Sequence, residues 1–194
     1  MIEARALAKR YGDKRVFAGV DLDVARGDFT LVTGPNGSGK TTLLRLLAGL
    51  AAPSAGTLTV DTSRERVGYV AHEALVYREL TARENLWLYA RLYRVAQPGE
   101  RIGMLLERFG LWEARDDRVG SYSRGMQQRL ALCRILLHGP ELLLLDEPYS
   151  GLDASARTLV DEVLADVAGA RTLVVASHEP EHVRPLATQA LALA

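Results

Sequence analysis

The sequence predicts an α/β fold in which a mostly parallel sheet is combined with an N-terminal antiparallel β subdomain and an inserted α-helical subdomain. Three observations predict it. Short alternating strand patterns fill residues 1–27, and a glycine-rich turn starting at Gly34 separates an apolar run from a leucine-rich run. The continuous apolar run at residues 142–145 is typical of a strand buried on both faces of a parallel sheet, and residues 171–177, RTLVVAS, indicate a further buried strand. Helical patterns occupy the intervening residues, about 75–138.

The composition fits a single domain over residues 1–194 and argues against several classes of partner. The formal net charge is zero. We therefore expect no nucleic-acid partner, and we interpret basic pairs such as Lys14-Arg15 as solvated surface.

The lone cysteine, Cys133, has apolar neighbours and is predicted to be a buried structural thiol in a reducing compartment. No apolar stretch approaches the ~18 to 20 residues of a membrane span, and no signal peptide is expected.

The N-terminal strands are predicted from alternation. Ile2, Ala4 and Ala6 alternate with polar residues, and residues 16–24 follow a turn at Gly12. These strands are expected to pair in an antiparallel sheet. Further strands are predicted at residues 57–60 and 67–70.

The run from Gly34 to Thr41 fits G-x-x-x-x-G-K-[ST], the phosphate-binding P-loop, and lies between a predicted strand and a predicted helix. Its glycines let several backbone N–H groups converge on one anion, and the helix dipole adds to this. We expect Lys40 to bridge the β- and γ-phosphates of a nucleotide, and the Thr41 hydroxyl to hold Mg²⁺. The nucleotide-binding residues predicted here are Gly34, Pro35, Asn36, Gly37, Ser38, Gly39, Lys40, Thr41 and Thr42.

The helical block begins with a capping-box pattern, Thr81-x-x-Glu84, followed by an apolar stripe over residues 85–93. Two more helices are predicted at about residues 100–109 and 124–137. The aromatic residues of the stripe are interpreted as packed core and not as a cofactor box.

The apolar run 142–145 ends in Asp146-Glu147-Pro148. At the end of a buried strand, Asp146 is placed to hold Mg²⁺, and Glu147 to polarise the water that attacks a γ-phosphate. A helix over residues 154–167 follows, with Asp153 as its expected cap, and the next buried strand ends at His178. Together with the P-loop, these acids predict an ATPase site.

These motifs, in this order, resemble the nucleotide-binding domain of ATP-binding cassette (ABC) proteins over essentially the whole chain. Residues 122–126, YSRGM, resemble the signature loop, although three positions depart from the common LSGGQ form. Residues 150–153 resemble the D-loop, His178 the switch histidine, and Tyr11 the aromatic residue that stacks on adenine. The resemblance implies a P-loop NTPase core that uses ATP and Mg²⁺.

The resemblance also implies partners. The signature residues Ser123, Arg124, Gly125 and Met126 would contact the ATP of a second nucleotide-binding subunit, in a head-to-tail dimer with two ATP molecules between the subunits. Asp153 would link the two sites, and integral membrane permease subunits would dock on the helical block near His72 and residues 75–79. The expected location is the cytoplasmic face of the bacterial inner membrane, as a peripheral subunit.

One departure from the family concerns His72, which stands where a glutamine usually contacts Mg²⁺ and the attacking water. Because the charge of a histidine depends on pH, we expect an unusually pH-sensitive hydrolysis. If this is right, His72→Gln changes the pH profile of ATP hydrolysis, and an unchanged profile contradicts it.

Residues 71–93 and 122–153 further resemble the ATP-binding subunit of the bacterial cytochrome c biogenesis (haem) exporter, the CcmA type. The alternatives are an ATPase of another two-component exporter, for drugs, polysaccharide or lipid, and a soluble non-transport ABC protein. The second usually has two cassettes in one chain, whereas this sequence has one. A P-loop GTPase would require an Asn-Lys-x-Asp motif, which the sequence does not contain.

Overall fold

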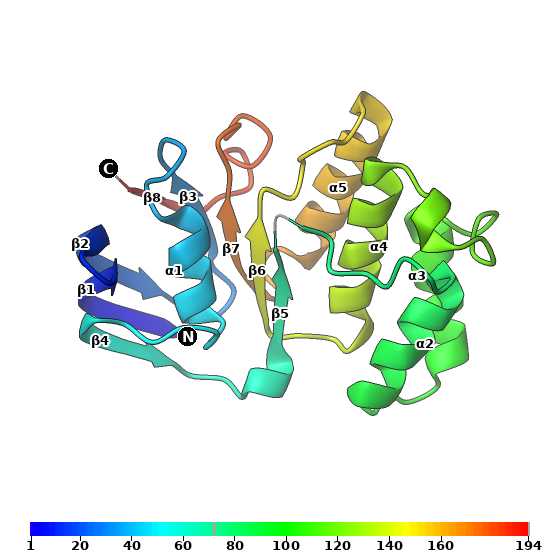
Figure 1. The fold of residues 1–194 in the computed structure, drawn as a ribbon, viewed down its shortest axis with the longest axis horizontal. Helices are drawn as coiled ribbons and strands as arrows, with labels where there is room; N and C mark the ends of the chain where they lie inside the picture. The colour runs from blue at the N-terminus through cyan, green and yellow to red at the C-terminus, as the bar shows by residue number, and fades with distance from the viewer. Residues whose placement is uncertain (72, 194) are drawn as a thin grey trace.

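The computed structural model describes residues 1–71 and 73–193, so the predicted catalytic residue His72 lies outside the described residues. At its centre is a five-stranded sheet with strand order β5-β6-β7-β3-β8, in which every pairing is parallel (Figure 1). The strands are β3 (Phe29–Thr33), β5 (Val67–Val70), β6 (Leu142–Asp146), β7 (Thr172–Ala176) and β8 (Gln189–Ala192). Strands β6 and β7 are buried at every position, as their apolar runs predict.

A second, antiparallel sheet has the order β2-β1-β4 and contains β1 (Ile2–Tyr11), β2 (Lys14–Val24) and β4 (Ala55–Val60). The predicted alternation is wrong at Ala6. A bulge between Ala4 and Leu7 turns Ala6 outward with φ +46°, and Leu7 takes the buried position. The Ala6 N–H, freed from the ladder, donates instead to the Asp21 carboxylate at 2.7 Å.

Helix α1 (Lys40–Leu47) lies between the two sheets (Figure 1). It packs its leucines against β1 on one side and against Leu142 and Leu144 of β6 on the other. The alternate residues Leu143 and Leu145 belong to the core on the opposite face, with α4 (Arg124–Leu137) and α5 (Ala154–Val167). The four consecutive leucines therefore serve two cores at once.

The helical block follows β5 and precedes β6, as predicted, and comprises α2 (Ala82–Leu92), α3 (Pro98–Arg108) and α4. Short 3-10 turns occur at η1 (Arg64–Arg66) and η2 (Val119–Ser121). The Thr81–Glu84 capping box is formed, and Cys133 is buried, which raises the pKa of its thiol. In the part of the chain that the structure describes, none of the helices has the length and apolar character that a membrane crossing requires.

Candidate active site

The P-loop connects the end of β3 to the first turn of α1, and its glycines are required by the space around them. Gly34 has φ +147°, and a Cβ there would lie 2.4 Å from the Leu193 carbonyl oxygen. Gly39, the residue that precedes α1, has φ +99°, and a Cβ there would lie 2.7 Å from Val16 and Phe17. The loop can therefore follow this tight path only with glycine at both positions.

A cavity of about 550 Å³ opens beside the P-loop. Four segments bound it: the P-loop with the start of α1, the β1–β2 hairpin, the loop after β6 and the loop after β7. The predicted site residues that line it are Tyr11, Asn36, Gly37, Gly39, Lys40, Thr41, Thr42, Glu147 and His178. Segments far apart in the sequence thus meet at one cavity.

The Lys40 ammonium group is held over the P-loop. Its Nζ donates to the carbonyl oxygens of Gly34 at 2.8 Å and Pro35 at 3.3 Å, and lies 3.9 Å from Glu147 Oε1. The Lys40 side chain is only 7% exposed. Nearby, the buried Ser38 hydroxyl has no hydrogen-bond partner among the residues described. A cation and an unsatisfied hydroxyl in one loop suit an oxyanion such as phosphate.

Glu147 and His178 form a close pair across the ends of β6 and β7. The Glu147 carboxylate accepts the His178 backbone N–H at 3.2 Å, and its Oε2 lies 2.7 Å from His178 Nδ1. Glu147 has φ +51°, a left-handed backbone that is uncommon for a residue with a side chain. Its own N–H donates to the Ala176 carbonyl at 2.9 Å, which fixes the residue to the end of β7.

The donors predicted for Mg²⁺ are chemically suitable. Thr41 lines the cavity with a hydroxyl, and Asp146 ends β6 with a carboxylate on a residue that is 1% exposed. Within the described ranges there is no cluster of three or more acidic, histidine or cysteine side chains that could hold a metal by itself. Mg²⁺ commonly takes one or two protein oxygens and completes its shell with water and substrate phosphates, and the residues present fit that mode.

Lys14 and Arg15 are exposed, as predicted for a solvated basic pair, and they also line the cavity together with Val16, which was not predicted. Lys14 pairs with Tyr11 across the β1–β2 hairpin, so the hairpin turn brings the basic pair to the same wall as the half-exposed Tyr11 ring. The sequence contained the signal: a two-residue turn places Lys14 directly opposite the predicted adenine-stacking residue. Two cations there favour a polyanionic ligand.

The signature residues form a separate cluster. In the described part of the chain, none of Ser123, Arg124, Gly125 and Met126 lines the P-loop cavity. The Ser123 hydroxyl caps α4 by accepting from the Met126 N–H at 3.2 Å, and Arg124 donates to the Ser150 hydroxyl at 2.9 Å. The preceding Tyr122 is a buried anchor, because its hydroxyl donates to the Ala114 carbonyl at 2.6 Å.

Asp153 caps α5, as predicted, because its Oδ1 accepts from the Ala156 N–H and the Ser155 hydroxyl, each at 2.8 Å. The backbone hydrogen bond from Ala156 lowers the pKa of this carboxyl group. Its predicted role in linking two sites would be additional to this capping role.

The sequence matches the family described as ABC transporter over residues 17–150. Daunorubicin resistance ATP-binding protein DrrA3 of Streptomyces coeruleorubidus is 42% identical over 92% of this chain and 60% of its own length. Nod factor export ATP-binding protein I of Burkholderia orbicola is 38% identical over 95% of this chain and 65% of its own length. The ATP-binding protein NatA of Bacillus subtilis is 34% identical over 96% of this chain and 82% of its own length.

The chain spans 60–65% of the length of the first two of these relatives. Among solved structures, the dimeric ATP-binding cassette MJ0796, in a post-hydrolysis state bound to ADP and Pi, has the same fold, with a TM-score of 0.90. It is 25% identical and is matched over 100% of this chain and 94% of its own. The fold predicted from the sequence is therefore confirmed.

Proposed function

Since the chain belongs to the ABC transporter family, as an ATP-binding domain, we propose that it binds MgATP and hydrolyses it to power a separate membrane permease. The observation that carries this proposal is the cavity of about 550 Å³, where the P-loop, Glu147 and His178 meet. Purified protein is expected to hydrolyse ATP in the presence of Mg²⁺. An inactive preparation that is folded and saturated with MgATP, with and without its permease, would contradict the proposal.

The predicted site residues would have separate roles in this reaction. Lys40 exchanges its carbonyl contacts for the β- and γ-phosphate oxygens, and Tyr11 stacks on the adenine ring. Glu147 accepts a proton from the attacking water, and His178 holds the γ-phosphate while orienting Glu147 through their 2.7 Å contact. Mg²⁺, held by Thr41 and Asp146, would neutralise charge on the phosphates when bound.

We place the signature residues on a second copy of the chain. Ser123 and Gly125 lie at the start of the 14-residue helix α4, where a hydroxyl, backbone N–H groups and the helix dipole favour an anion. They are outside their own chain's cavity, so this receptor would close over the ATP of a partner subunit in a head-to-tail dimer. The dimeric state of MJ0796 supports this arrangement.

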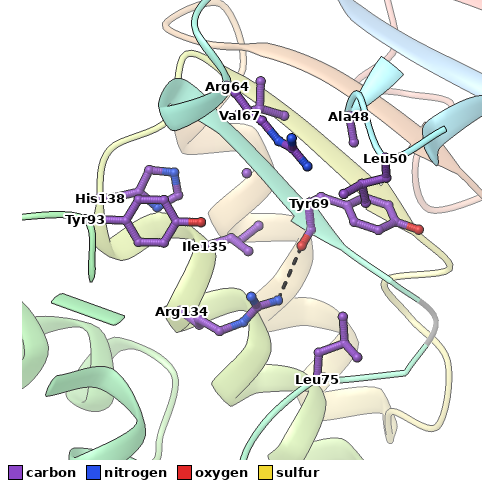
Figure 2. Close-up of a pocket in the computed structure, with 11 residues that line it drawn as sticks. Ala48, Leu50, Arg64, Val67, Tyr69, Leu75, Tyr93, Arg134, Ile135 and His138 are labelled. Atoms are coloured by element: carbon purple, nitrogen blue, oxygen red, sulfur yellow. Dashed lines mark hydrogen bonds between the residues drawn. The ribbon is translucent and has the colours of Figure 1, made fainter. Parts of the chain in front are cut away.

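A groove between the helical block and the parallel sheet is the proposed dock for the permease (Figure 2). It encloses about 240 Å³, and its lining includes the exposed aliphatic side chains Leu50 and Leu75. Arg64 and Arg134 supply positive charge, and no acidic residue is among the described residues that line it. Burial lowers the pKa of the lining His138 to about 4, so this histidine is uncharged at neutral pH.

The chemistry of the groove defines the partner segment that fits it. Aliphatic side chains on the partner would cover Leu50 and Leu75, and a carboxylate would pair with an arginine. We therefore propose an amphipathic cytoplasmic segment of the permease that carries at least one acidic residue. We further propose that the chain is a peripheral subunit on the cytoplasmic face of a bacterial inner membrane.

Leu75→Asp is expected to abolish co-purification with the permease and to leave the ATPase rate of the isolated chain within about twofold, since Leu75 lies outside the ATP cavity and is 53% exposed. Pull-down from membranes and a phosphate-release assay measure the two quantities. Met104→Asp is the matched control, because Met104 lies on α3 and is 63% exposed. Unimpaired permease binding by Leu75→Asp would remove the groove from the docking role.

The cargo that we propose is an exported drug or a molecule of the Nod factor kind, because two of the relatives named above are named for daunorubicin resistance and Nod factor export. Haem handling in cytochrome c biogenesis is the second candidate. It is supported only by the resemblance of residues 71–93 and 122–153, and these relatives do not support it. Identification of the membrane subunits that co-purify with the chain decides between the two: subunits of a cytochrome c maturation system would favour haem.

A further inference from the structure

Helix α5 carries two charged side chains, one helical turn apart, that each contact both of the loops bearing the catalytic pair. The first is Arg157. Its Nη1 lies 2.8 Å from Glu179 Oε2 in the loop after β7, and its Nε donates to the Leu152 carbonyl at 3.3 Å in the loop after β6. Arg157 therefore ties the two loops to one helix.

The second is Asp161. Its Oδ1 accepts the Tyr149 hydroxyl at 2.7 Å, and its Oδ2 lies 3.4 Å from His182 Nδ1. Tyr149 belongs to the loop after β6 and His182 to the loop after β7, and their rings stack with centroids 5.2 Å apart. Tyr149 is 3% exposed, and burial together with Asp161 raises the pKa of its hydroxyl, so the hydroxyl remains a donor.

The partners of Arg157 and Asp161 lie close to the catalytic pair, Glu147 and His178. Tyr149 lies two residues after Glu147 in the chain. Glu179 directly follows His178, and its Oε1 is 3.6 Å from His178 Nε2. The five side chains Tyr149, Arg157, Asp161, Glu179 and His182 are called the α5 bracket below.

The catalytic pair needs such support. Glu147 holds a left-handed backbone, which persists only where its surroundings enforce it, and the His178 side chain is 50% exposed. A displacement of about 1 Å in such a pair can cost a factor of about 100 in rate. The Glu147–His178 contact and the Glu147 N–H bond to Ala176 join the loops at the cavity, and the bracket joins them again on the α5 side.

We propose that the α5 bracket is a positioning element for hydrolysis. It holds the Glu147 and His178 side chains in their relative positions, while the P-loop binds the nucleotide. Tyr149, Arg157, Asp161 and His182 do not line the nucleotide cavity as described, so they act through the catalytic pair and not on ATP. This inference rests on the proposed ATPase function.

Asp161→Ala removes both bracket contacts of one side chain, and we expect kcat for ATP to fall about tenfold while KM and ATP affinity stay within about twofold. Asp161→Asn keeps an acceptor for Tyr149 and a donor toward His182 Nδ1, so it should restore most of the rate. Glu162→Ala is the matched control, because this neighbouring acid of α5 is exposed. Steady-state kinetics and equilibrium ATP binding are measured for all three variants.

An Asp161→Ala enzyme with a wild-type kcat overturns the proposal, and so does one whose ATP affinity and melting temperature fall in step with kcat, which would indicate general loosening. Tyr149→Phe provides a second test that removes one hydroxyl without opening the core. It is expected to lower kcat about threefold at unchanged KM. An unchanged kcat would exclude the Tyr149–Asp161 hydrogen bond from the positioning role. If the wild-type chain itself shows no ATP hydrolysis, the proposed function fails first, and the two failures are thereby distinguished.

Discussion

Glu147→Gln is expected to bind MgATP normally and to hydrolyse it about a thousandfold more slowly than the wild-type chain. In the wild-type chain, the Glu147 carboxylate lies 2.7 Å from His178 Nδ1. Glutamine keeps the size of this side chain and an oxygen that can face His178, but it cannot accept a proton from water. The measurements are single-turnover hydrolysis and equilibrium ATP binding. Since ATP would persist at the site, the variant should also accumulate an ATP-bound dimer, visible by size-exclusion chromatography.

Glu162→Gln, on the exposed face of α5, is the control for a change of charge without a change at the cavity. It should hydrolyse ATP at the wild-type rate, and its elution from size-exclusion chromatography should respond to ATP as that of the wild-type chain does. Turnover by Glu147→Gln within tenfold of wild type would exclude Glu147 as the general base.

Lys40→Ala should weaken ATP binding by about a hundredfold, the loss typical of a buried charge-assisted contact. The Lys40 side chain is 7% exposed, and its ammonium group lies within the P-loop, 2.8 and 3.3 Å from the carbonyl oxygens that it would exchange for phosphate oxygens. Isothermal titration calorimetry with ATP, and separately with ADP, measures the effect. The loss should be larger for ATP, because the γ-phosphate contact is also removed.

Arg45→Ala is the matched control, as it deletes an exposed cation from the same helix, α1, outside the cavity. It should leave ATP affinity unchanged. If Lys40→Ala retains the micromolar affinity of an intact site, the P-loop assignment does not hold.

Features dictated by local sequence were predicted well. Helices α4 and α5 have the predicted bounds, because a serine and an aspartate cap them and their apolar spacing is regular. The four leucines of β6 predict a strand buried on both faces, and the structure divides them between two cores. The convergence of the P-loop, Glu147 and His178 follows from a rule of parallel sheets, whose strand ends meet at one edge.

Features that depend on distant contacts were not predicted. The four residues of β8 carry no strong strand pattern, and their pairing with β3 defines the strand. The bulge at Ala6 is held by Asp21 of the neighbouring strand, and alternation in β1 alone gives no sign of it. The α5 bracket depends on contacts among three segments. In the sequence alone, its residues therefore look like ordinary surface and loop residues.

The contact between Gly34 and Leu193 has a consequence for the order in which the protein matures. Leu193 donates its N–H to the Thr33 carbonyl at 2.8 Å, and its own carbonyl occupies the space beside Gly34 that a side chain would need. A ribosome makes the P-loop well before it makes this supporting residue. The phosphate-binding loop therefore cannot gain its full support until residues 189–193 have left the exit tunnel, so that nascent chains shorter than this should bind nucleotide weakly.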